Sequence, residues 1–253
     1  MNSCALRTLQ YFWQDDGRTV SKGIIIDMIK ALLFDFDGLI LDTETPDLQS
    51  WMEIYSEYDV SFPASSWMIA VGGSRDLFDP YKHLESHLNH SIRMDEIRAK
   101  RRRRDNELVL AQIPLPGVEE YIDDASIRGL MLAVASSASR DWVIPHLSRI
   151  GLLSRFHCIK CCDDVSDAKP APELYEAVLL ELGVQASEAV AFEDSPNGVA
   201  AAAQAGVYCV AVPNSVTSQL SLNEADLRIE SMADLSLDDL LQCVGLGTGN
   251  QIR

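Results

Sequence analysis

The architecture of this chain can be worked out from one segment, Ala31-Leu-Leu-Phe-Asp-Phe-Asp-Gly-Leu-Ile-Leu-Asp-Thr-Glu44. Its first four residues are apolar, which is long enough for a buried strand but short for a helix. Asp35 ends this run, and Asp37 follows two positions later, so in an extended segment both carboxylates project to the same side. Two such carboxylates repel each other unless a cation lies between them. Mg²⁺ prefers oxygen ligands and fits this role; the alternative is a strand that ends in a solvated acidic turn.

The overall composition is that of an ordinary globular protein, with 47% hydrophobic and 23% charged residues in 253. This length allows one large domain, or a core with a smaller second domain. The formal net charge of -17 argues against a protein that binds nucleic acid or an anionic membrane, because such a protein should be basic. No apolar run approaches the roughly 20 residues that a membrane-spanning helix needs.

The six cysteines do not form the pattern of a disulfide framework, and they predict reduced thiols in a cytoplasmic protein. His157, Cys158, Cys161 and Cys162 suggest a zinc site as an alternative. In a strand over 156–161, however, Cys158 and Cys161 would face opposite sides. Because tetrahedral zinc ligation is exacting, we favour structural thiols.

The first 113 residues contain three distinct parts. Residues 1–29 are interpreted as a loosely ordered N-terminal extension without a signal peptide, with Met28 as an alternative start. Residues 30–44 contain the first strand. Residues 45–113 show a helical pattern, with helices expected at 48–58, 74–91 and 94–110.

Two basic features lie in this helical part. The run of five basic residues at 100–104 sits in an acidic protein, and we interpret it as a solvated helix face rather than a nucleic-acid contact. Arg75 follows paired glycines that allow a tight loop. An arginine in such a loop could bind a substrate anion.

From the Pro-rich linker at 114–117 onward, apolar strands alternate with amphipathic helices. Strands are predicted at 130–135, 156–161, 189–192 and 207–212, and helices at 118–127, from 140, from 172 and at 196–205. This alternation predicts an α/β fold with a Rossmann-like, doubly wound parallel sheet. The segments 30–44 and 114–244 would form its core, 45–113 an inserted all-helical cap, and 245–253 a C-terminal tail.

Polar residues lie where the predicted strands end, and in a doubly wound sheet these ends share one edge, where ligands bind. They are Asp35 and Asp37 after the first strand, Ser136 and Ser137 after the next, Lys169 before a helix, and Glu193 and Asp194 after the strand at 189–192. The turn at Ser136 could hold a phosphate with its hydroxyl and N–H groups. Each residue also has an ordinary structural interpretation, as a turn, cap or surface residue.

Four of these segments resemble, in order and spacing, the motifs of the haloacid dehalogenase-like (HAD) hydrolase superfamily. They are Asp35-Phe-Asp-Gly-Leu-Ile-Leu-Asp-Thr-Glu44, Ser136, Lys169-Pro-Ala-Pro172 and Glu193-Asp-Ser-Pro-Asn-Gly198. The likeness is greatest to the beta-phosphoglucomutase-like and phosphatase-like branch with a helical cap, and it covers residues 30–244.

The resemblance implies a role for each of these residues. Asp35 would be the nucleophile that forms an aspartyl-phosphate, and Asp37 the general acid and base. Asp35, the backbone carbonyl of Asp37, and Asp194 would bind Mg²⁺.

The same resemblance implies how a phosphoryl group would be held. Ser136, the backbone of Ser137, and Lys169 would contact its oxygens, and Glu193 would orient Lys169. These groups would position and neutralise the transferred phosphoryl group.

The resulting hypothesis is a Mg²⁺-dependent phosphatase that acts on a small phosphate ester such as a sugar phosphate. A phosphosugar mutase is the alternative, weakened because Pro46-Asp47 stands where family mutases tend to carry a histidine. A dehalogenase is disfavoured by Asp37, and a non-catalytic phosphate-binding regulator is the third class. The sequence leaves the substrate and the oligomeric state open, and a monomer is compatible with it.

Overall fold

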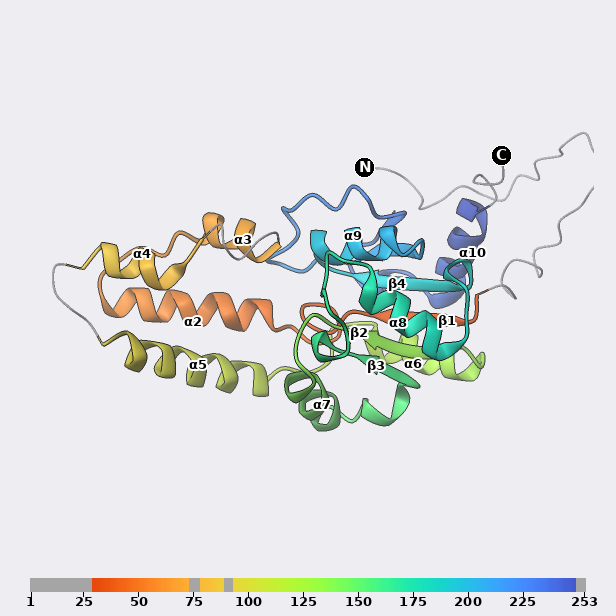
Figure 1. Cartoon of the computed structure of the whole chain (residues 1–253), viewed down its shortest axis with the longest axis horizontal. Helices are drawn as coiled ribbons and strands as arrows, with labels where there is room; N and C mark the ends of the chain where they lie inside the picture. Colours follow the sequence, from red (N-terminus) through yellow and green to blue (C-terminus); the bar gives the residue numbers. More distant parts are fainter. Residues whose placement is uncertain (1–28, 73–77, 89–92, 249–253) are drawn as a thin grey trace, which may run out of the picture.

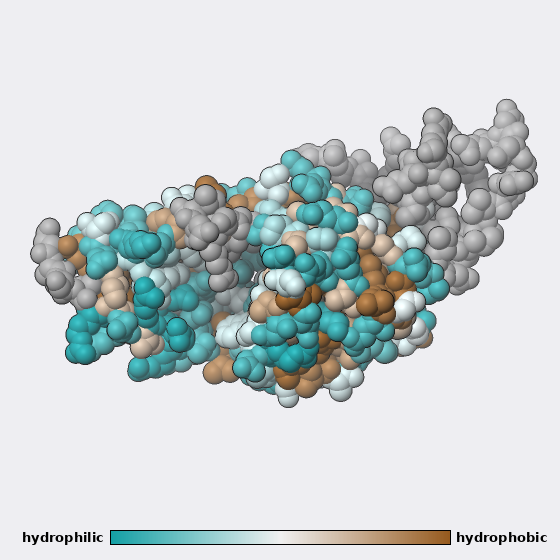
Figure 2. All heavy atoms as spheres, viewed as in Figure 1, coloured by the Kyte–Doolittle hydropathy of each residue, from teal (hydrophilic) through white to brown (hydrophobic). Residues whose placement is uncertain are grey.

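The computed structural model describes residues 29–72, 78–88 and 93–248. It has an α/β body and, beside it, an elongated helical lobe formed by residues 44–110 (Figure 1). None of the described helices is both long and apolar enough to cross a membrane. In the space-filling view, hydrophilic residues cover most of the visible face of the helical lobe (Figure 2).

The body is built on a six-stranded parallel sheet with the order β3-β2-β1-β4-β5-β6. The strands are β1 (Ala31–Phe34), β2 (Met131–Ala135), β3 (Cys158–Lys160), β4 (Ala189–Glu193), β5 (Tyr208–Ala211) and β6 (Leu227–Arg228). Phe34 at the end of β1 is in register with Val134 of β2 and Phe192 of β4. The three strand ends therefore lie side by side, and the predicted doubly wound parallel sheet is confirmed.

Helices cover both faces of the sheet, which explains the continuous apolar strands. They are α6 (Val118–Ile127), α7 (Arg140–Arg149), α8 (Glu173–Leu182), α9 (Pro196–Gln204) and α10 (Leu237–Thr248), with short 3₁₀ turns at Leu153–Arg155, Cys162–Asp164, Ala186–Glu188 and Met232–Asp234. Leu32 and Phe34 face the cluster made with α6, α7 and α10. Ala31 and Leu33 face the cluster made with α8 and α9.

The helical lobe contains α2 (Glu44–Glu57), α3 (Ala64–Gly72), α4 (Pro80–Ser86) and α5 (Met94–Leu110). It has an apolar cluster of its own, in which Trp51 and Tyr55 of α2 join residues from the other three helices. Val216, from the loop after β5 in the body, is 1% exposed and belongs to the same cluster. The lobe is therefore packed against one loop of the body as well as connected to it by the chain.

Within the predicted helix at 74–91, the described residues are helical only over 80–86, and 74–77 and 89–91 lie outside the described residues. Helix α4 begins only at Pro80, because the Asp79 side chain caps it by accepting from the backbone N–H groups of Tyr81 and Lys82. The sequence analysis also missed α3, which lies before this segment, and it placed the start of α2 four residues too late, whereas α5 has the predicted bounds.

The basic run in α5 is only partly solvated, which corrects its interpretation as a solvated face. Lys100, Arg101 and Arg104 form ion pairs with acidic residues of α2. The Arg101 side chain is 15% exposed and lies over the Trp51 ring, with 4.6 Å between the guanidinium carbon and the ring centroid. The run therefore helps to join α5 to α2.

The C-terminal part differs from the expectation of a tail starting at 245. Helix α10 continues to Thr248, because Leu240, Leu241 and Val244 are buried and the helix packs against α6. Strand β6 was also missed, since its two residues are too few to give a pattern. The predicted strand at 156–161 shortens to β3.

The cysteines near β3 are free thiols. Within the described part of the chain, the residues that could share a metal ion do not include His157 or these cysteines. Burial raises the pKa of Cys158 to about 12 and that of Cys161 to about 11. The burial of Cys158 and Cys161 fits the structural role that the sequence analysis favoured.

Gly117 and Gly129 provide a matched test of the packing at the start of α6. Both have positive φ, but a Cβ on Gly117 would lie 2.3 Å from the backbone of Met232 and Ala233, whereas a Cβ on Gly129 would meet nothing within 4 Å. Gly129→Ala should cost about 1 kcal/mol of unfolding free energy for the left-handed backbone. Gly117→Ala should cost about 1–3 kcal/mol more through overpacking. Urea unfolding of both variants measures the difference, and equal losses would contradict this account.

Candidate active site

The candidate site lies at the carboxyl edge of the sheet, beside β1. Asp35 follows β1, and its N–H donates to the carbonyl of Phe192 at 3.0 Å, which holds it against β4. Ser136 follows β2, and its N–H donates to the carbonyl of Lys160 at 2.9 Å. Because β1 lies between β2 and β4, the residues that follow these strands are brought to one place, as the topology rule predicts.

Lys169 comes from the loop before α8, and its ammonium group is the centre of the site. Nζ lies 2.5 Å from Asp35 Oδ1, 2.7 Å from Glu193 Oε1 and 2.6 Å from the carbonyl oxygen of Ala135. The side chain is 4% exposed. Burial opposes its charge, but the carboxylates of Asp35 and Glu193 outweigh this and raise the pKa of Lys169. Lys169 is therefore a fixed cation.

Glu193 is the last residue of β4, and its side chain is fully buried. Oε1 accepts from the Tyr175 hydroxyl as well as from Lys169. On the other side, a Cβ at Gly198 would lie 1.8 Å from Oε2, so only glycine leaves room for the carboxylate. Burial raises the pKa of Glu193 to about 7, although the charge of Lys169 lowers it.

Asp194 is held by Asn214, a residue that the sequence analysis did not single out. The Asn214 amide Nδ2 donates to Asp194 Oδ2 at 2.7 Å and to the Gly38 carbonyl at 3.1 Å. Gly38 has φ +76°, and a Cβ on it would lie 2.5 Å from Asp194 Oδ2. Asn214 lies in the loop after β5, so the strand-end rule applied to that strand would have pointed to it.

The carboxylates of Asp35, Glu193 and Asp194 fit a divalent cation. One oxygen from each lies within 4.8 Å of the others, and all three residues are buried. Burial, and then the charge of Asp35, raise the pKa of Asp194 well above its usual range. Carboxylate oxygens are the ligands that Mg²⁺ prefers. Lys169 binds one oxygen of Asp35 and one of Glu193, so each of these carboxylates shares its charge between the ammonium group and any ion at this place.

Asp37 is partly buried and lies near Asp35, on the segment that turns away from β1. Its Oδ1 accepts from the Trp142 indole Nε1–H at 2.8 Å. Burial, and then the charge of Asp35, raise the pKa of Asp37 to about 6, although the indole N–H lowers it. A carboxyl group with this pKa can both donate and accept a proton near neutral pH. Trp142 had no signal in the sequence.

The other predicted site residues are Ser136, Ser137 and Arg75. Ser136 is buried, and its Oγ accepts from the N–H of Ala138 at 3.0 Å, whereas the neighbouring Ser137 is exposed. Ser139 occupies the N-cap position of α7, but its side chain makes no capping hydrogen bond. Arg75 lies outside the described residues.

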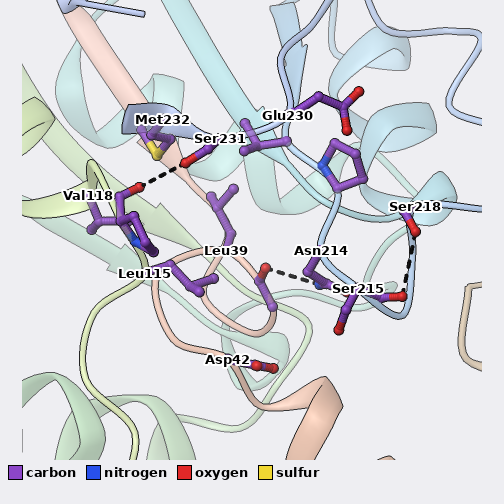
Figure 3. A pocket seen from close by; sticks show the side chains of 14 residues that line it. Leu39, Asp42, Leu115, Val118, Asn214, Ser215, Ser218, Glu230, Ser231 and Met232 are labelled. Atoms are coloured by element: carbon purple, nitrogen blue, oxygen red, sulfur yellow. Dashed lines mark hydrogen bonds between the residues drawn. The ribbon is translucent and has the colours of Figure 1, made fainter. Parts of the chain in front are cut away.

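A cavity of about 450 Å³ lies behind the Gly38 turn and does not include the carboxylates of Asp35, Asp37 or Asp194 in its lining. Leu39 and Asp42 line it from the segment that leads into the lobe, and Leu115 from the segment that returns (Figure 3). Asn214, whose amide donates to Asp194, also lines it.

Comparisons with known proteins identify the family. The profile of the family described as haloacid dehalogenase-like hydrolase matches residues 32–212. The protein YhcW of Bacillus subtilis is 44% identical over 214 residues, which cover 85% of this chain and 97% of YhcW. The phosphorylated carbohydrates phosphatase of Thermotoga maritima is 29% identical over 203 residues, which cover 78% of this chain and 91% of that protein.

A solved structure gives the same result. The crystal structure of CbbY from Rhodobacter sphaeroides in complex with phosphate has a TM-score of 0.64 and 28% sequence identity to this chain, and the match covers 84% of this chain and 99% of CbbY. The profile match spans most of the α/β body and the whole helical lobe. The chain therefore belongs to the haloacid dehalogenase-like hydrolase family and is an enzyme of that family.

Proposed function

We propose that this enzyme is a Mg²⁺-dependent phosphatase that hydrolyses a small phosphorylated metabolite, such as a sugar phosphate. One observation carries the proposal: Asp35 lies 2.5 Å from the ammonium group of Lys169, and one of its carboxylate oxygens is within 4.8 Å of an oxygen of the buried Asp194 carboxylate. The name of YhcW includes the word phosphatase, and the Thermotoga maritima relative is named for phosphorylated carbohydrates. CbbY was solved with phosphate.

The reaction is proposed to run in two displacements at phosphorus. Asp35 attacks the phosphorus atom, so that a bond to Asp35 forms while the bond to the ester oxygen breaks. Asp37 donates its proton to the departing oxygen, and its pKa of about 6 suits this step. Asp37 then removes a proton from water, which attacks the same phosphorus atom and releases inorganic phosphate and Asp35.

Enzymes catalyse phosphoryl transfer mainly by positioning the reacting groups and by neutralising the charge on the transferred phosphoryl group. The Ser136 hydroxyl, the Ser137 N–H and the Lys169 ammonium group are proposed to contact the phosphoryl oxygens. Asp35, Asp194 and the Asp37 carbonyl would hold Mg²⁺, which neutralises charge on the phosphoryl oxygens when bound. Glu193 keeps Lys169 in place.

The helical lobe is proposed to act as a cap that covers the ester and excludes water. In this division, 30–44 and 114–244 form the core, and Arg75 in the cap contacts the substrate. The Asp47 carboxylate forms an ion pair with Arg101. Family mutases tend to carry a histidine where this chain has Pro46-Asp47, and this difference supports hydrolysis over phosphosugar isomerisation.

Asp35→Asn should reduce phosphate release by about a thousandfold or more, because an amide is a poor nucleophile. Phosphate release from a panel of phosphate esters measures this loss, and circular dichroism shows that the variant is folded. Asp238→Asn is the control, since Asp238 is an exposed residue of α10. Substantial turnover by Asp35→Asn would show that another residue is the nucleophile.

Removing Mg²⁺ with a chelator should abolish phosphate release, and adding Mg²⁺ should restore it. Binding to the folded state alone also raises Tm, by an amount that grows with the Mg²⁺ concentration. This rise should be present in the wild type and much smaller in Asp194→Asn, which weakens the carboxylate set. An equal rise in both proteins would place the ion elsewhere.

Trp142→Phe should raise the pKa of Asp37 above about 6, because the variant removes the indole N–H that stabilises the carboxylate. The carboxyl ¹³C resonance of Asp37, followed through a pH titration of the metal-free protein, measures this pKa. Trp67→Phe in the helical lobe is the control and should leave the value unchanged. A pKa that stays the same or falls in Trp142→Phe would contradict the assigned hydrogen bond.

A further inference from the structure

We infer that Tyr175 is a positioning residue of the active site, which fixes the place of the Lys169 ammonium group. It acts in two ways: its hydroxyl holds the Glu193 carboxylate, and its ring lies against Lys169. This inference rests on the proposed function, because it assumes that Lys169 binds the phosphoryl group. Tyr175 itself would touch neither the substrate nor the ion.

The hydroxyl contact involves the same carboxylate oxygen that binds the lysine. Glu193 Oε1 accepts from the Tyr175 hydroxyl and lies 2.7 Å from Lys169 Nζ. Both Tyr175 and Glu193 are fully buried, so water does not compete for this oxygen. Hydrogen bonds to a buried charged group are strong and directional. The Tyr175 hydroxyl therefore fixes the orientation of the Glu193 carboxylate that binds Lys169.

The Tyr175 ring gives a second, direct contact. Lys169 Nζ lies 5.3 Å from the ring centroid, which is within the range of a cation–π interaction. The ammonium group is thus placed by Asp35, Glu193, the Ala135 carbonyl and this ring. Displacement of the ring or of Glu193 would let Lys169 move toward Asp35 or away from it.

The second oxygen of Glu193 makes the hydroxyl contact more important. Oε2 is buried and has no hydrogen-bond partner among the described residues, and Gly198 packs against it. Without the Tyr175 hydroxyl, Lys169 would be the remaining partner of this carboxylate, which could then rotate. Leaving a buried carboxylate with a single partner also costs free energy. The side chains around Lys169 should therefore rearrange in a variant without the Tyr175 hydroxyl.

Local structure explains how Tyr175 reaches the site. Pro172 is the N-cap of α8, so Tyr175 lies in the first turn of the helix, six positions after Lys169 in the sequence. Its ring is buried in the apolar cluster between α8, α9 and the sheet. This packing leaves the hydroxyl at the end of β4, where Glu193 lies.

The test compares two buried tyrosines on opposite faces of the sheet. Tyr121 belongs to the other apolar cluster, and its hydroxyl donates to the Leu235 carbonyl at 2.8 Å. Tyr175→Phe and Tyr121→Phe each remove one buried hydroxyl, and both should lower Tm. Only Tyr175→Phe should also reduce kcat for p-nitrophenyl phosphate, by about tenfold, the effect of one hydrogen bond to a charged group.

The distribution of the loss between kcat and KM separates positioning from general destabilisation. Charge on the phosphoryl oxygens is stabilised most in the transition state, so a misplaced Lys169 should lower kcat more than it raises KM. Should Tyr175→Phe lose no more kcat than Tyr121→Phe, the inference is wrong. Tyr175→Met, which removes both the hydroxyl and the ring, is a second variant and should lose at least as much kcat as Tyr175→Phe.

A double-mutant cycle shows whether Tyr175 acts through Glu193. In a Glu193→Ala background, the further change Tyr175→Phe should alter kcat by less than about twofold, because the hydroxyl no longer has its carboxylate partner. A full tenfold loss in that background would mean that the hydroxyl acts by another route, and this too would overturn the inference.

Binding of inorganic phosphate distinguishes failure of this inference from failure of the proposed function. If the wild type releases no phosphate from any ester, the proposed function fails. Calorimetric titration with inorganic phosphate then still tests the position of Lys169. Weaker phosphate binding by Tyr175→Phe than by Tyr121→Phe is expected, and equal or absent phosphate binding in wild type and both variants would overturn the inference.

Discussion

The Lys169 ammonium group lies against Asp35, Glu193 and a backbone carbonyl, and the rest of the site depends on this contact. Three carboxylates within 4.8 Å of one another could not stay charged in a buried site without a cation. Removing one partner of such a buried ion pair typically costs about 3–5 kcal/mol. The positions of Asp35, Glu193 and the Ala135 carbonyl therefore determine where the Lys169 ammonium group lies.

The parallel sheet provides the rigid part of this arrangement. β1 lies between β2 and β4, and the register of Phe34 with Phe192 places Asp35 beside the end of β4. Alternate residues of β1 enter two different apolar clusters, so the strand is fixed from both faces. A residue that follows such a strand has little freedom, which suits the proposed role of Asp35 as a nucleophile that approaches phosphorus in line.

The sequence could predict the meeting of Asp35 and Asp194, because backbone topology alone brings the ends of β1 and β4 to one edge, whereas the place of Lys169, in the loop before α8, followed from the family resemblance. It could not predict that Asn214 would hold Asp194 or that Tyr175 would hold Glu193, because those contacts depend on how loops and helices pack. The error at 74–91 is of another kind. The described helix there begins at Pro80, and the capping sequence Asp79-Pro80 was the signal that marks this start.

The loop that carries Val216 contacts both the helical lobe and the candidate site. Val216 packs in the apolar cluster of the lobe, and two residues earlier Asn214 holds Asp194. Ser215, between them, contacts Thr45 at the start of α2. Rotation of the lobe must therefore either pull this loop along or give up the burial of Val216. A cation that bound at Asp194 more tightly in one orientation of the lobe would, by linkage, shift the lobe toward that orientation by the same free energy.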